Sequence, residues 1–264
     1  MNDPALLDEL RKKIGQAERA DERSWPVVGS GAADFDASLP EGGFATGALH
    51  EVLPATYADF PAALGFGLGM AARILDTRPG PMLWVLPAYQ TASHGALHPD
   101  GLAAFGIDPD RLIHVSAPKT QTMLWALEEA LANRAVSVVT GILPENDRFY
   151  DFTPSRRLVL GAARHGVTAL VFATHPQAGG ATAAMTRWSV AAEPGIAAPR
   201  AGQAVPGLTA PRWHVHLLRS RRGGRGQWHL EWNHETLSFR LAAPLADRTP
   251  QRSFGLHTGQ RAAG

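Results

Sequence analysis

The chain has 264 residues, of which 45% are apolar and 19% are charged, enough to build the core of one large domain. It contains no cysteine, which excludes disulfide bonds, thiolate metal sites and cysteine nucleophiles. No apolar run approaches the roughly 18 to 20 residues of a membrane span, and the acidic amino terminus does not resemble a signal peptide. We therefore expect a cytoplasmic protein without membrane contact.

The net charge of +1 conceals an uneven distribution. Residues 1–199 carry 15 Lys and Arg against 21 Asp and Glu, whereas residues 200–264 carry 10 against 3. Lysine occurs only at Lys12, Lys13 and Lys119, so the basic end is made of arginine. This composition suits phosphate recognition and a GC-rich genome equally well.

The first elements in chain order are a helix and a linker. Residues 1–23 predict an amphipathic helix, because Leu6, Leu10 and Ile14 recur at helical spacing. That apolar stripe needs a partner, either its own domain or another protein. Residues 24–38 are rich in Gly, Ser, Pro and Asp and predict a linker.

Residues 39–243 predict the core domain. Short apolar runs predict strands buried on both faces, at 48–53, 81–86, 112–115, 136–140 and 167–173. The stretches between them predict helices, at 61–75, 97–105, 120–133 and 154–165. This alternation predicts an α/β fold with a mainly parallel β-sheet flanked by helices.

The carboxyl-terminal part predicts a different pattern. Residues 213–218, 227–232 and 237–241 alternate polar and apolar side chains, as antiparallel strands do, and a turn rich in Arg and Gly joins the first two. We name residues 213–241 the basic hairpin. Residues 193–211 predict a loop, and residues 244–264 predict a disordered tail.

The basic hairpin is a candidate binding surface. Arginine forks and aromatic faces together bind single-stranded nucleic acid, and the hairpin offers Arg219, Arg221, Arg222, Arg225 and Trp228. An acidic protein partner would suit the same arginines. A solvated turn in front of core tryptophans is the third interpretation.

The order of these elements resembles the RecA core over residues 39–241. The resemblance begins with Leu-Pro-Glu-Gly-Gly at 39–43, which we name the approach loop, and continues through Phe-Gly-Ile-Asp-Pro at 105–109. It implies that residues 143–153 and 176–186 correspond to the DNA-binding loops of RecA. The first of these carries Glu145, Asp147 and Asp151, so we expect no RecA-style filament on DNA.

A RecA-like ATPase needs a phosphate loop of the form GxxxxGK[ST] after its first core strand. In that register Leu53 and Ala58 replace the glycines, Asp59 replaces the lysine and Phe60 replaces the hydroxyl residue. The strand that should end in a magnesium-binding Asp carries Thr140, and residues 86–90 lack a catalytic carboxylate. We therefore predict a pseudo-ATPase with no cofactor.

The approach loop, Leu-His-Glu-Val at 49–52 and the basic hairpin together resemble the ImuA family. The resemblance implies a non-catalytic accessory protein of SOS-induced translesion DNA synthesis, associated with the nucleoid when DNA is damaged. Its implied role is an adaptor for ImuB, a polymerase-like protein, and for an error-prone DNA polymerase, with RecA as a further partner. Weak contact with single-stranded DNA and homo-oligomerisation stay open. The alternatives are a nucleotide-binding RecA-like switch or DNA-binding ATPase, and a SulA-type cell-division inhibitor.

Two groups of histidines are candidate metal ligands. His94 and His98 have helical ligand spacing, and His214 and His216 share one face of a predicted strand with His229 across the hairpin. No cysteine or well-spaced carboxylate completes either set, so we expect no metal.

Overall fold

The computed structural model describes residues 25–89, 95, 97–144, 148–176, 180–195 and 210–242. The predicted helix over 1–23, with Leu6, Leu10 and Ile14, and the predicted tail over 244–264 lie outside these residues. In chain order the elements are β1 (Val27–Val28), α2 (Ala33–Ser38), β2 (Phe44–Ala45), β3 (Leu49–Pro54), the 3-10 turn η1 (Tyr57–Asp59), α3 (Phe60–Thr77), β4 (Met82–Pro87), α5 (Pro99–Ala104), η2 (Pro109–Arg111), β5 (Leu112–Ala117), α6 (Thr120–Leu131), β6 (Val138–Leu143), α7 (Phe152–His165), β7 (Thr168–Ala173), β8 (Thr186–Glu193), β9 (Arg212–Ser220), β10 (Gly226–Asn233) and β11 (Ser238–Leu241).

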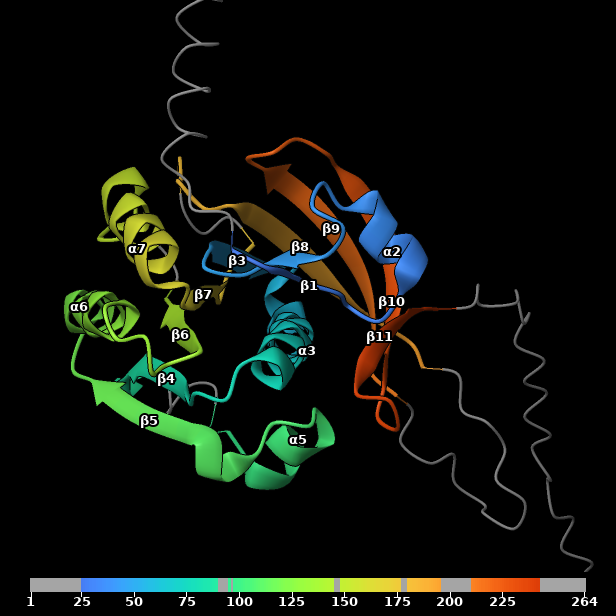
Figure 1. Ribbon diagram of the computed structural model, residues 1–264, viewed down its shortest axis with the longest axis horizontal. Helices are drawn as coiled ribbons and strands as arrows, with labels where there is room; N and C mark the ends of the chain where they lie inside the picture. The colour runs from blue at the N-terminus through green and yellow to red at the C-terminus, as the bar shows by residue number, and fades with distance from the viewer. Residues whose placement is uncertain are drawn as a thin grey trace, which may run out of the picture.

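A nine-stranded mixed sheet forms the centre of the molecule, in the order β11-β10-β9-β8-β3-β7-β6-β4-β5 (Figure 1). The strands from β8 to β5 run parallel, and β9, β10 and β11 add an antiparallel extension at the β8 side. β1 and β2 pair separately. The predicted α/β class and the antiparallel carboxyl-terminal strands are therefore confirmed.

Helices cover both faces of the sheet. α6 and α7 lie on one face and α3 lies on the other, together with α2 (Figure 1). α6 faces the sheet because Met123, Leu127 and Leu131 recur every four residues and are fully buried. On the opposite face α3 contributes Phe66 to an aromatic cluster with Trp188 of β8, whose ring centroid lies 5.6 Å away.

One helical stretch in the described chain, Tyr57–Thr77, has the length and composition of a membrane span. Of its most apolar window, 61% is buried inside the molecule. It contacts β3, β7 and β8, so it is the central core helix of this face.

Residues 24–38 differ from the linker that their composition predicts. The described part contains β1 and α2, and the ring of Phe35 is fully buried. That ring meets Phe44 and Trp228, with centroids 6.0 and 5.0 Å away. The local composition is that of a loop, and burial of one aromatic side chain places the segment on the core.

Two strands also differ from their predictions. β6 begins at Val138 and continues to Leu143, so Thr140 lies inside the strand and not at its end, and its hydroxyl donates to Leu83 O at 3.2 Å. β8 was not predicted: it lies between the two stretches expected as loops, 176–186 and 193–211, and no element was expected over 187–192. Its alternation of Trp188 and Val190 with more exposed residues is the signal that could have revealed it.

Candidate functional site: a closed strand-to-helix junction and an ion-paired basic hairpin

The junction between β3 and α3 stands where a phosphate loop would be. Thr56 and Asp59 form a reciprocal capping box: Asp59 Oδ2 accepts from Thr56 N at 3.0 Å and from Thr56 Oγ1 at 2.7 Å. Asp59 Oδ1 accepts from Ala192 N of β8 at 2.9 Å. The carboxylate in the lysine position therefore ties the junction to a neighbouring strand.

Three backbone amides of this junction donate to carbonyl groups within the chain. Ala55 N donates to Val190 O at 2.8 Å, and Asp59 N donates to Thr56 O at 3.0 Å. The Phe60 amide donates to Tyr57 O. A phosphate loop binds its ligand through amides that point at the phosphate, and these three point at protein carbonyls instead. Of the predicted positions, Leu53 and Phe60 are buried and Ala58 is exposed.

The Asp59 carboxylate is held in its charged form. Burial alone would raise its pKa, but the hydrogen bonds from Ala192 N and from the side chain and amide of Thr56 outweigh burial. The pKa of Asp59 is consequently below its ordinary value. A fixed negative charge at this position repels a triphosphate.

The turn of the basic hairpin packs on the approach loop. Arg222 Nη1 donates to Glu41 Oε2 at 2.5 Å, an ion pair between residues 181 positions apart. Beside it Gly224 adopts a positive φ of 82°, and a Cβ there would lie 3.0 Å from the ring of Pro40. Two of the segments that carry the family resemblance are thus in direct contact.

The other arginines of the hairpin turn have contacts of their own or are exposed. Arg219 is exposed and donates through Nη1 to Thr182 O, and the Arg221 amide donates to Met185 O at 2.9 Å. Arg225 is exposed in the turn. Of the four predicted arginines, Arg222 is thus paired with a carboxylate, and Arg219 and the Arg221 amide contact the segment just before β8.

The hairpin tryptophans belong to the core. Trp213 and Trp232 are buried, and the half-buried Trp228 packs on Phe35 and on Trp188, with a centroid distance of 6.2 Å to the latter. These rings do not present the open faces on which nucleotide bases stack. The geometry supports the core interpretation of the tryptophans and leaves the arginines as the exposed chemistry.

A narrow pocket of about 20 Å³ lies beneath the ion pair. Its wall brings together the approach loop, His50 of β3 and Arg222 of the hairpin turn. The remaining wall is mostly apolar, with Leu39, Phe44, Met185, Trp188 and Leu217. The three sequence motifs of the resemblance therefore converge on one place in the fold.

Glu51 is a functional candidate that the sequence analysis did not single out. Its carboxylate is 2% exposed and accepts from Tyr150 and Thr182 hydroxyls, each at 2.5 Å, and from Arg187 Nε at 2.6 Å. Burial and the neighbouring Glu51 charge raise the pKa of Tyr150 well above its ordinary value. Tyr150 and Thr182 come from the two stretches that resemble the DNA-binding loops of RecA, and Glu51 joins them.

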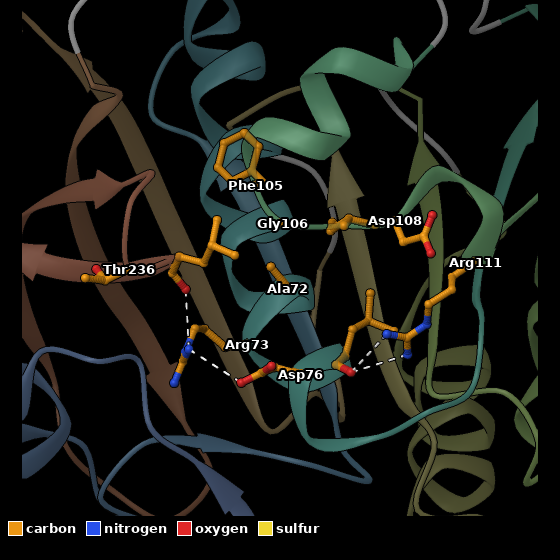
Figure 2. A pocket seen from close by; sticks show the side chains of 11 residues that line it. Ala72, Arg73, Asp76, Phe105, Gly106, Asp108, Arg111 and Thr236 are labelled. Atoms are coloured by element: carbon orange, nitrogen blue, oxygen red, sulfur yellow. Dashed lines mark hydrogen bonds and ion pairs between the residues drawn. The ribbon is translucent and has the colours of Figure 1, made fainter.

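A wider cavity of about 170 Å³ lies at another junction, between α3, the α5–η2 segment and the β10–β11 turn (Figure 2). Arg73 donates to Leu237 O at 3.3 Å and lies 3.9 Å from Asp76 Oδ2, and Arg111 donates to Leu75 O at 3.3 Å (Figure 2). Both arginines thus bind backbone carbonyls that border the cavity. None of the predicted site residues lines it.

Among the described residues, no group of three or more His, Asp or Glu side chains is arranged to hold a metal ion. His214 and His229 stack with centroids 4.8 Å apart, and His229 Nδ1 lies 2.5 Å from Glu193 Oε1. His94 lies outside the described residues.

The fold and this site define the class of protein: an α/β protein with a mixed, mostly parallel sheet whose β3–α3 junction is closed by the carboxylate of Asp59. No family model matches the chain. Protein ImuA from two strains of Caulobacter vibrioides is 31% identical over 236 residues, which cover 84% of this chain and 91% of the relative. The chain belongs to the ImuA family. Membership supports involvement in damage-inducible mutagenesis.

Proposed function

We propose that the chain is a non-catalytic accessory protein of damage-inducible translesion DNA synthesis. The observation that carries this proposal is the closed β3–α3 junction, in which Asp59 takes the lysine position and holds Thr56 and Ala192. The chain acts as an adaptor: it presents its surface to an ImuB-type polymerase-like protein and an error-prone DNA polymerase. RecA is a further partner in this scheme.

Nucleotide binding tests the non-catalytic part. Calorimetry of the full chain with ATP and Mg²⁺ is expected to give no binding heat, because the Ala55, Asp59 and Phe60 amides have intrachain acceptors and Asp59 repels phosphate. Micromolar binding, equivalent to about −8 kcal/mol, would show that the chain is a nucleotide-driven switch.

Replacing the carboxylate by lysine is not expected to create an ATP site. Asp59→Lys supplies the missing cation, but Ala55 N and Asp59 N still donate to Val190 O and Thr56 O. We expect no ATP binding by this variant in the same calorimetric titration, with the intact fold checked by circular dichroism. ATP binding by Asp59→Lys would mean that the lysine alone was lacking.

Capture of the partner tests the adaptor part. Immobilised full chain is expected to retain an ImuB-type protein, and the double variant Arg221→Glu/Arg222→Glu is expected to lose it while its thermal unfolding midpoint stays close to that of the parent. Equal capture by both proteins would remove the hairpin from the proposed interface.

A further inference from the structure

One arginine of the basic hairpin is paired with an acidic side chain of the same protein. Arg222 and Glu41 meet at 2.5 Å, and their side chains are 33% and 21% exposed. Ion pairs this accessible to solvent contribute at most about 1 kcal/mol to stability. The pair can therefore exchange one carboxylate for another at little energetic loss.

In the approach loop, Glu41 is followed by two glycines. Gly42 and Gly43 follow directly and have φ values of 76° and 154°, in the range that favours glycine. A Cβ on Gly42 would meet nothing within 4 Å, so the loop is open to solvent at this point. Glu41 is thus delivered to Arg222 by a loop segment and not by a rigid strand or helix.

The surroundings of the pair favour a peptide over a nucleic acid. The pocket below the pair holds only about 20 Å³, too little for a side chain, so recognition at this place rests on the charges of the pair. The tryptophans of the hairpin pack on the core. Base stacking, the second component of single-strand recognition, is poorly served here, because the exposed ring of His229 already stacks on His214 and pairs with Glu193. The group that occupies Arg222 is itself a carboxylate.

We propose that Glu41 is an internal ligand of the basic hairpin, and that the hairpin binds an acidic segment of a protein partner whose carboxylate replaces Glu41 on Arg222. This inference rests on the proposed adaptor function and specifies the partner chemistry of the same surface. Glu41 lowers the apparent affinity of that surface, because only the fraction of molecules with the ion pair open can bind. The ion pair is therefore an autoinhibitory contact.

The test uses the full chain and a fluorescein-labelled peptide, Glu-Leu-Glu-Glu-Leu-Glu, in fluorescence anisotropy titrations. Glu41→Gln is expected to bind the peptide about 2- to 5-fold more tightly than the parent, because the ion pair is worth at most about 1 kcal/mol, and Arg222→Gln about 5-fold more weakly. The reversed pair Glu41→Arg/Arg222→Glu keeps an ion pair between the same two positions and is expected to lose peptide binding with an unchanged unfolding midpoint.

Two controls separate this mechanism from general electrostatics. Arg240→Gln breaks another ion pair of the same antiparallel strands, with Glu231 at 2.5 Å, and is expected to leave peptide affinity unchanged. The same peptide with Gln in place of Glu is expected not to bind.

Unchanged or weaker peptide binding by Glu41→Gln would overturn the proposal, as would a gain in affinity that appears only for a 20-nucleotide oligothymidylate probe. These results are independent of ATP binding and of ImuB capture. A failure of the adaptor function and a failure of the Glu41 mechanism are therefore told apart.

Discussion

His50 of β3 is a buried histidine with a complete set of hydrogen bonds. Trp188 Nε1 donates to Thr186 Oγ1, the Thr186 hydroxyl donates to His50 Nδ1, and His50 Nε2 donates to Ala45 O, each at 2.7 Å. The His50 ring therefore accepts at Nδ1 and donates at Nε2, which only the neutral imidazole can do. Burial lowers the pKa of His50 from 6.5 to about 4, although the hydrogen bond to Ala45 O opposes the shift.

A pH-dependent stability follows from His50. Between pH 6.5 and about 4 the unfolded chain binds a proton at His50 and the folded chain does not, so the free energy of unfolding falls as the pH is lowered. The full effect is about 3 kcal/mol. Urea unfolding at pH 7, 6 and 5 is expected to show a shallower loss for His50→Gln than for the parent protein.

The control for this experiment is His98→Gln. The His98 side chain is 76% exposed, so its replacement is expected to leave the pH dependence as steep as in the parent. Identical pH profiles for His50→Gln and the parent would show that His50 does not carry the effect.

At the scale of elements, α3 shows how one helix accommodates aromatic neighbours. A Cβ on Gly67 would lie 2.2 Å from Phe172 Cε1 of β7, and a Cβ on Gly69 would lie 2.5 Å from Phe239 of β11. Glycine lowers helix propensity by about 1 kcal/mol relative to alanine. The close approach of the two rings explains why glycine stands there nevertheless.

Alanine substitutions at two helical glycines are expected to act in opposite directions. Gly67→Ala gains propensity but displaces Phe172, and we expect a net loss of about 1–3 kcal/mol in the free energy of unfolding. Gly101→Ala in α5 meets nothing within 4 Å and is expected to gain about 0.5–1 kcal/mol. Urea unfolding of both variants measures the contrast, and a gain at both positions would contradict the packing argument.

At the scale of the whole molecule, Glu51 connects segments far apart in the chain. It lies in β3, and its donors come from before α7, from before β8 and from β8 itself. Thr182 also accepts, through its carbonyl, from Arg219 of the basic hairpin. The buried carboxylate thus links the hairpin to the stretches that follow β6 and β7.

Replacing Glu51 is expected to weaken this connection strongly. Glu51→Leu leaves Arg187 without its carboxylate, and breaking a buried pair in this way destabilises by roughly 3 kcal/mol. Tyr150→Phe removes only one donor and is expected to lose about 1 kcal/mol. Hydrogen exchange is expected to accelerate at 148–153 and 180–185 in Glu51→Leu. Equal stability of the two variants would contradict a central role for the carboxylate.

The local features of the chain were predictable from the sequence. The alternation of apolar runs with helical stretches predicted the parallel strands other than β8 and the helices α3, α5, α6 and α7, because periodicity depends on neighbours along the chain. The lack of a lysine between Lys13 and Lys119 was likewise a fact of the sequence. The resemblance of its short motifs to the ImuA family led to the family that the chain belongs to.

Only the tertiary structure decided which distant residues meet. The placement of β8 beside β3 brings Arg187 to Glu51, and the return of the hairpin brings Arg222 to Glu41 across 181 positions. The same packing turned the hairpin tryptophans inward and buried Phe35 of the predicted linker. These outcomes depend on the order of strands in the sheet and on which face of each strand is covered. Neither property is determined by neighbouring residues along the chain.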